Sequence, residues 1–96
     1  MATAERLVYP HITRDPAVCS GAPCVEGTRI RVVDVVSLHE DGLSPGEIVR
    51  QFPSLKNAAE VYAALLYYHD HRDEIEADLR EEERLEQEVG RGRSKA

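Results

Sequence analysis

The chain has 96 residues, of which 42% are hydrophobic, 31% are charged and 5% are aromatic, with no Trp and one Phe. A chain of this length fits one domain with a modest core, so we expect self-association, and the scarcity of large aromatic side chains disfavours an enzyme with a deep substrate pocket. No basic segment followed by an apolar run and no apolar stretch of membrane-spanning length occurs, so we expect a cytoplasmic protein without membrane contact.

The formal net charge of -6 is concentrated in one segment. Residues 70–89 contain ten acidic and three basic residues, whereas residues 1–69 contain eight acidic and six basic ones. Residues 90–96 contain three basic residues and no acidic one, and we expect this tail to be disordered. Charge that is concentrated in one segment says more about binding partners than the net charge of the whole chain does. The acidic segment is therefore a candidate binding surface.

Residues 1–32 are predicted to form a β arm followed by a hairpin. Pro10 interrupts the apolar run Leu7–Ile12, which is typical of an edge segment or an arm rather than a central strand. The Arg-Asp-Pro sequence at residues 14–16 then predicts a turn.

The hairpin itself is predicted over residues 23–32, where Glu26 and Gly27 form a two-residue turn between short β-prone runs. A lone hairpin is marginally stable in water, so it has to pack on helices or pair with another chain. Strict alternation separates an apolar from a cationic side, with Thr28, Ile30 and Val32 on one and Arg29 and Arg31 on the other.

Residues 33–70 are predicted to form a helix-turn-helix core of three helices. The first helix covers residues 33–41 and ends where Gly42 takes a left-handed conformation, with Leu43 contacting Leu38. The second helix starts at the N-cap Ser44, with Pro45 in the first helical position and Glu47 completing a capping box, and it stops before Pro53.

The third helix begins at the N-cap Asn57, with Glu60 repeating the capping pattern. Between Asn57 and Val89 there is no Gly or Pro, so an acidic helix is predicted over residues 71–89. The sequence leaves two arrangements open, because Asp70 or Asp73 could cap a fourth helix after a bend or the two helices could form one rod. Val61, Leu65, Tyr68, Ile75 and Leu79 keep a four-three spacing in which Arg72 is the one polar position.

Several short motifs occur in a specific order and spacing over roughly residues 11–80. They are Arg-Asp-Pro at 14–16, Cys-Ser-Gly-Ala-Pro at 19–23, Gly-Thr-Arg-Ile-Arg-Val at 27–32, Gly-Leu-Ser-Pro at 42–45, Phe-Pro at 52–53, Val-Tyr-Ala-Ala-Leu at 61–65 and Tyr-Tyr at 67–68. Through these motifs the chain resembles the domain of unknown function 433 family, whose members are described as VapB-like antitoxins with a homeodomain-like fold. The resemblance implies a DNA-binding antitoxin that occludes a PIN-like nuclease toxin and represses their shared operon.

Two sets of residues are candidate binding sites. The candidates for DNA contact are four cationic side chains and the polar residue that starts the third helix, namely Arg29, Arg31, Arg50, Lys56 and Asn57. Residues 57–70, which occupy the recognition-helix position, contain no Lys or Arg, and this disfavours DNA. The acidic helix is the candidate for covering a basic RNA-binding groove of a toxin, through Ile75, Leu79, Glu82, Glu83 and Glu86.

No catalytic residue, metal ligand set or cofactor is predicted. Consecutive helical residues diverge by about 100°, so His69 and His71 do not share a helix face. Cys19 and Cys24 lack the spacing of a zinc finger and are expected to serve as compact apolar residues.

These patterns predict a mainly α fold with a small N-terminal β-ribbon, a three-helix core and an acidic C-terminal helix. The leading functional hypothesis is an antitoxin-like protein of a type II toxin–antitoxin system, forming a homodimer or higher homo-oligomer. The alternatives are a standalone DNA-binding repressor and a protein-interaction module with no nucleic-acid role.

Overall fold

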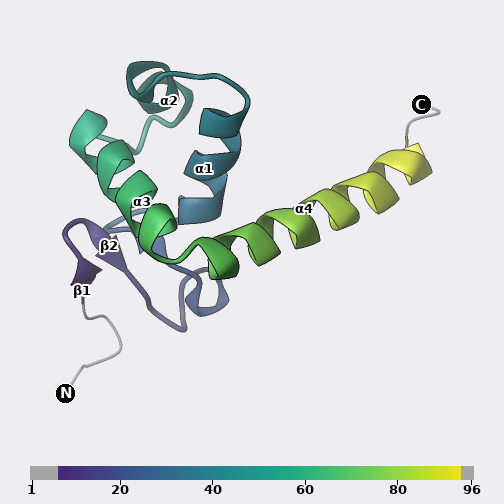
Figure 1. Cartoon of the computed structure of the whole chain (residues 1–96), viewed down its shortest axis with the longest axis horizontal. Helices are drawn as coiled ribbons and strands as arrows, with labels where there is room; N and C mark the ends of the chain where they lie inside the picture. Colours follow the sequence, from purple (N-terminus) through teal and green to yellow (C-terminus); the bar gives the residue numbers. More distant parts are fainter. Residues whose placement is uncertain (1–6, 94–96) are drawn as a thin grey trace.

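The computed structural model describes residues 7–93, which form a compact body with one long helix extending from it (Figure 1). The prediction of a mainly helical chain with a small N-terminal antiparallel sheet is confirmed. The elements in chain order are β1 (Leu7–Tyr9), β2 (Ile12–Thr13), the short 3-10 helix η2 (Cys19–Gly21), β3 (Cys24–Val25), α1 (Val32–Glu40), α2 (Pro45–Gln51), α3 (Ala58–Asp70) and α4 (Arg72–Arg93).

The N-terminal segment forms a hairpin of its own, where the sequence predicted an arm. β1 pairs with β2, and β2 pairs with β3, all antiparallel. Pro10 and His11 form the two-residue turn between β1 and β2, and His11 has a φ of 68°. Proline fixes the φ of the first central turn position and a positive φ follows at the second, so Pro10 starts this turn and does not end the ribbon.

The second run of the predicted hairpin is not a regular strand. It contacts β3 through one isolated bridge, between Cys24 and Arg31. The Thr28 hydroxyl donates to the carbonyl of Val25 at 2.8 Å and accepts the N–H of Ile30 at 3.0 Å. Backbone bonds from the Val25 N–H to the Ile30 carbonyl and from the Val32 N–H to the Pro23 carbonyl, both at 2.9 Å, flank the bridge, so the run returns along β3 as a short hairpin.

The junction of α1 and α2 has the predicted geometry. Gly42 has a φ of 99°, and its N–H donates to the carbonyl of His39 at 3.0 Å. The N–H of Leu43 donates to the carbonyl of Leu38 at 3.1 Å, which completes a Schellman motif. The predicted stop of the first helix is confirmed.

The predicted capping box of α2 is also present. The N–H of Glu47 donates to Oγ of Ser44 at 3.2 Å, and the N–H of Ser44 donates to Oε1 of Glu47 at 2.8 Å. These bonds to Ser44, chiefly the one from its backbone N–H, lower the pKa of the Glu47 carboxyl. Both N–H groups are therefore satisfied within the turn itself.

The start of α3 departs from the prediction in one contact. Oδ1 of Asn57 accepts the N–H of Ala59 at 3.0 Å, as an N-cap does. The Glu60 carboxylate accepts the N–H of Lys56 at 2.7 Å and is only 5% exposed. Glu60 therefore bonds one residue further back than in a capping box and closes the loop between α2 and α3.

α3 and α4 are two helices separated by a bend at His71, which decides between the two arrangements that the sequence left open. The N–H of His71 donates to the carbonyl of Tyr68 at 3.0 Å, and its carbonyl accepts the N–H of Ile75 at 3.1 Å. His71 thus ends one ladder and starts the next. α4 extends to Arg93, beyond the expected end at Val89 and into the segment expected to be disordered, while residues 94–96 lie outside the described residues.

A single apolar core joins the sheet to all four helices. Its central member on α4 is Ile75, which is fully buried, and the Tyr67 ring on α3 stacks on His71 with centroids 4.2 Å apart. Within residues 7–93 no helix is long and apolar enough to cross a membrane. The buried cluster consists of Ile12, Val25, Ile30, Val32, Val33, Val35, Val36, Ile48, Leu55, Val61, Ala63, Ala64, Tyr67, Tyr68 and Ile75.

Candidate partner-binding groove

A groove of about 520 Å³ lies between α1, the C-terminal end of α2 and α4. It combines apolar side chains with carboxylates, and the residues that line it include no Lys or Arg. The lining residues are Val33, Asp34, Ser37, Leu38, Gln51, Phe52, Leu79, Glu82, Glu83 and Glu86. We call this the α1–α4 groove.

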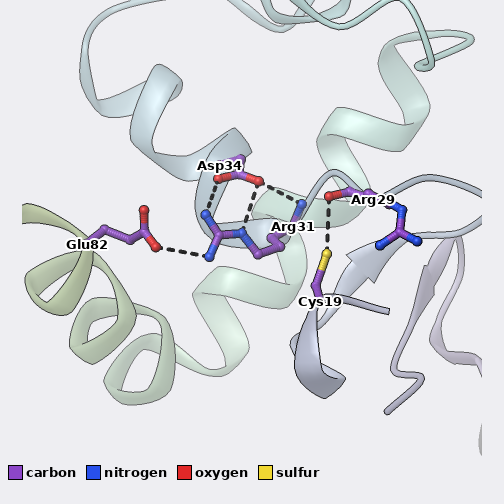
Figure 2. Close-up of polar contacts among 5 residues, drawn as sticks. All are labelled: Cys19, Arg29, Arg31, Asp34 and Glu82. Atoms are coloured by element: carbon purple, nitrogen blue, oxygen red, sulfur yellow. Dashed lines mark hydrogen bonds and ion pairs between the residues drawn. The ribbon is translucent and has the colours of Figure 1, made fainter. Parts of the chain in front are cut away.

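Arg31 fixes the position of α4 beside α1 (Figure 2). Its Nη2 donates to Oδ1 of Asp34 at 2.8 Å, its Nε donates to Oδ2 of the same carboxylate at 3.2 Å, and its Nη1 donates to Oε2 of Glu82 at 3.0 Å. The hydrogen bonds to Asp34, and then that to Glu82, raise the pKa of the Arg31 guanidinium. One guanidinium therefore joins the first turn of α1 to the middle of α4.

The remaining carboxylates of the groove are not compensated in this way. Asp34 and Glu82 share Arg31, whereas neither Glu83 nor Glu86 forms an ion pair within the described part of the chain. Burial, and then the nearby Glu74 carboxylate, raise the pKa of Asp78 on the same helix. The α4 side of the groove is therefore a region of negative potential beside apolar surface.

Four of the five residues predicted to bind a partner line the α1–α4 groove. These are Leu79, Glu82, Glu83 and Glu86. Ile75 is 0% exposed and belongs to the chain's own core, so its role is to hold the root of α4 on the body. The sequence did not indicate Leu38 and Phe52 as groove residues, because their helical spacing marks them only as partly buried positions.

The five residues predicted to contact DNA are not gathered into one cationic surface. Arg31 is occupied by Asp34 and Glu82, and Figure 2 shows the Arg29 guanidinium pointing away from that pair. Arg29 lines a second hollow together with Ser54 of the loop between α2 and α3. Arg50 is exposed at the C-terminal end of α2, and Lys56 is exposed in the loop before α3. The Asn57 side chain caps α3.

A polar cluster that the sequence did not predict ties the ribbon to α3 and α4. Nη2 of Arg14 donates to the Tyr67 hydroxyl at 2.8 Å and forms an ion pair with Glu74, and the Tyr67 hydroxyl donates to Oε1 of Glu74 at 3.2 Å. The Tyr9 hydroxyl donates to Oδ2 of Asp70 at 2.7 Å. These partners are far apart in the chain, so no local pattern could have revealed them.

No metal site emerges around the histidines and cysteines. Across the part of the chain that the structure describes, no group of three or more His, Cys, Asp or Glu side chains is arranged to hold a metal ion. Cys24 is buried and Cys19 is half-buried, with its Sγ donating to the carbonyl of Arg29 at 3.4 Å. Burial, with a further contribution from the Cys19 thiol, raises the pKa of Cys24 to about 12.

Comparison with known proteins places the chain in a family. A comparison with curated proteins found no match. The crystal structure of a DUF433 member protein from Anabaena variabilis ATCC 29413 superposes with a TM-score of 0.66 at 29% identity, covering 72% of this chain and 67% of that chain. The sequence pattern of DUF433, described as a protein of unknown function, matches residues 12–68, from β2 to near the end of α3. The chain therefore belongs to the DUF433 family.

Proposed function

We propose that this protein is the antitoxin-like member of a type II toxin–antitoxin pair and that it binds and neutralises a PIN-like nuclease. The observation that carries the proposal is the α1–α4 groove, in which apolar side chains lie beside the uncompensated carboxylates of Glu83 and Glu86. A nuclease that binds RNA presents a cationic surface to its substrate. An acidic helix laid on that surface competes with the phosphate backbone.

The groove has the composition that recognition of a basic amphipathic segment requires. Leu38, Phe52 and Leu79 offer apolar contact area, and Glu83 and Glu86 offer acceptors for Lys or Arg. Apolar anchors supply most of the affinity of such contacts, while complementary charge supplies specificity and fast association. α4 also extends well past the body of the protein (Figure 1), and its side chains from residue 83 to residue 88 are all exposed. Glu83 and Glu86 are therefore accessible to a partner from solvent.

Operon repression has weaker support from the geometry. Arg31 is committed to an internal ion pair, and the exposed side of α3 presents Tyr62 and Leu66 and no cation. A helix that enters the major groove usually offers Lys, Arg, Asn or Gln to bases and phosphates. We therefore propose protein binding as the primary activity, with no catalysis by this chain.

The test uses the product of the gene adjacent to this chain's gene, which the proposal expects to be a PIN-like nuclease. Binding is measured by isothermal titration calorimetry and neutralisation by the RNase activity that remains at equimolar ratio. The variant Glu83→Lys/Glu86→Lys changes the groove, and Glu81→Lys/Glu88→Lys makes the same charge change at positions that pair with Arg84 outside the groove.

We expect the wild-type chain to form a complex and suppress cleavage. The groove variant should bind at least about tenfold more weakly, and the control variant should bind within about threefold of wild type. If the RNase activity of the protein encoded by the adjacent gene stays unchanged in the presence of an equimolar amount of the wild-type chain, the proposal is contradicted. Equal weakening by both variants contradicts the assignment of the site, because it indicates only a long-range effect of net charge.

A further inference from the structure

The outward side of α3 carries two large apolar side chains that stay exposed in the described part of the chain. Tyr62 is 60% exposed and Leu66 is 50% exposed, and they are two of the three large hydrophobic side chains found exposed among the described residues. They are four residues apart on one helix, so they lie next to each other on its surface. Along the same side, Ala59 precedes Tyr62 by one turn and His69 follows Leu66 by one turn. We call these four residues the α3 face.

From Ala59 to Leu66 the α3 face is electrically neutral in a strongly acidic protein, and at its C-terminal end Nη1 of Arg72 lies 3.3 Å from Nδ1 of His69. The acidic residues of α3 are Glu60 and Asp70, and the helix has no Lys or Arg. Glu60 is buried and accepts the N–H of Lys56, and Asp70 lies at the last position of the helix. The exposed surface between Ala59 and Leu66 therefore carries no charged side chain.

We propose that the α3 face is a homodimer interface, in which the α3 helices of two copies pack antiparallel across a two-fold axis that passes between Tyr62 and Leu66. In this arrangement Tyr62 of each copy packs against Leu66 of the other. The small Ala59 of each copy lies opposite the larger His69 of the other. A two-fold axis makes every contact occur twice, so one apolar pair buries four large side chains.

Charge argues for a second copy as the occupant. Two chains that each carry a net charge of -6 repel each other, and the repulsion is least where neutral faces meet. Antiparallel packing also brings Lys56, just before the start of α3, to the end of the other helix at Asp70. The helix dipoles then oppose each other, which favours the same orientation.

The position of α4 is compatible with this interface. α1 packs on the inner side of α3, and α4 leaves the end of α3 on the side of α1 (Figure 1). The acidic helices of the two copies therefore extend away from the two-fold axis. The α1–α4 groove stays open in such a dimer, so dimerisation and partner binding use separate surfaces.

Because a single helix face is small compared with a permanent interface, the dimer should be reversible, with a dissociation constant on the order of 10 µM. Sedimentation equilibrium of the full chain without any partner protein measures it directly. We expect the mass to rise from 10.8 kDa towards twice that value as concentration increases. Leu66→Glu should weaken association at least about tenfold, whereas Leu85→Glu, at the third exposed large hydrophobic position, on α4, should leave it unchanged.

A mixing experiment tests the antiparallel register. Tyr62→Glu and Leu66→Lys should each impair self-association. Their mixture should form a heterodimer, because the introduced carboxylate of one variant then faces the introduced ammonium group of the other, while the native Leu66 and Tyr62 meet at the second contact. Far-UV circular dichroism shows whether every variant retains the fold.

Three outcomes would overturn the dimer, the position of its interface or its register. A wild-type chain that stays monomeric up to about 1 mM overturns the proposed dimer. Equal weakening by Leu66→Glu and Leu85→Glu overturns the placement of the interface on α3. A mixture of the two charged variants that fails to associate overturns the antiparallel register.

Discussion

Arg31 and Glu82 lie 51 residues apart in the chain, and their ion pair joins Nη1 to Oε2 at 3.0 Å. The same guanidinium binds Asp34 through two further nitrogen–oxygen contacts, so Asp34 holds it in position to bind Glu82. Arg31 therefore holds α4 on the body together with the apolar contacts of Ile75 and Leu79 and the Arg14–Glu74 ion pair.

Arg31→Ala should destabilise the fold by about 1–3 kcal/mol, because it removes several charge-assisted hydrogen bonds from a side chain that is only 30% exposed. Urea unfolding followed by circular dichroism measures the change. Arg29→Ala is the matched control, since Arg29 is exposed, and it should change stability by less than about 0.5 kcal/mol. Similar losses for both variants would show that Arg31 does not hold the helices together.

Gly42→Ala and Gly46→Ala should change stability in opposite directions. Gly42 has a φ of 99°, and an L-residue in that region is strained, so the alanine should cost about 1 kcal/mol. Gly46 lies within α2 with no atom near the site of a new Cβ, so the alanine should stabilise the helix by up to about 1 kcal/mol. Thermal unfolding midpoints compare the two, and a shift of the same sign in both would contradict the assigned conformations.

Glu60 should stabilise the fold through the acceptor that it offers to the N–H of Lys56. Glu60→Ala leaves that N–H without its bond and opens space at a buried position, so we expect a loss of about 1–3 kcal/mol. Glu60→Gln keeps an acceptor oxygen and should recover most of the loss. If the two variants are equally destabilised in chemical unfolding, the carboxylate acts by a different contact.

Stability should fall at alkaline pH because of Cys24. Its pKa is about 12 in the folded chain against an ordinary 9.0, so above pH 9.0 the unfolded chain releases a proton that the folded chain keeps. The contribution is fully present below pH 9.0 and is lost as the pH rises towards about 12. The raised pKa of the buried Tyr67 hydroxyl acts in the same direction.

Urea unfolding at a series of pH values measures this dependence. Cys24→Ala should lower stability at neutral pH but should flatten its decline above pH 9.0. A decline as steep as that of the wild-type chain would rule out the Cys24 thiol as its cause. A thiol reagent gives an independent check, because the native chain should react at the half-buried Cys19 and only the unfolded chain at Cys24.

The helices and their ends were predictable because local chemistry determines them. The left-handed Gly42 and the reciprocal bonds of Ser44 and Glu47 involve neighbouring residues, so sequence spacing alone located them. The hairpin of β1 and β2 was missed because Pro10 is common both in edge strands and in turns, and only the conformation of His11 distinguishes the two.

The candidate site was predictable in composition but not in shape. The acidic helix is visible in the sequence, and four of its predicted residues line the groove. Its other wall comes from α1 and α2, and the bend at His71 that brings α4 there has no local signal such as Gly or Pro. The cationic appearance of Arg31 was misleading, because its partner Glu82 is brought near only by the tertiary fold.

α4 is a long helix that is held on the body of the protein near one end. Its first three turns are anchored by Ile75, Leu79 and the ion pairs of Arg14 with Glu74 and Arg31 with Glu82, and the residues from 83 to 88 are all exposed. A helix of 22 residues is about 33 Å long, so small angular fluctuations at the root become displacements of several ångströms at the tip. The C-terminal end of α4 therefore moves through a larger volume than the end of a helix that is packed along its whole length. A molecule bound near the start of α4 would reduce that motion along the whole helix.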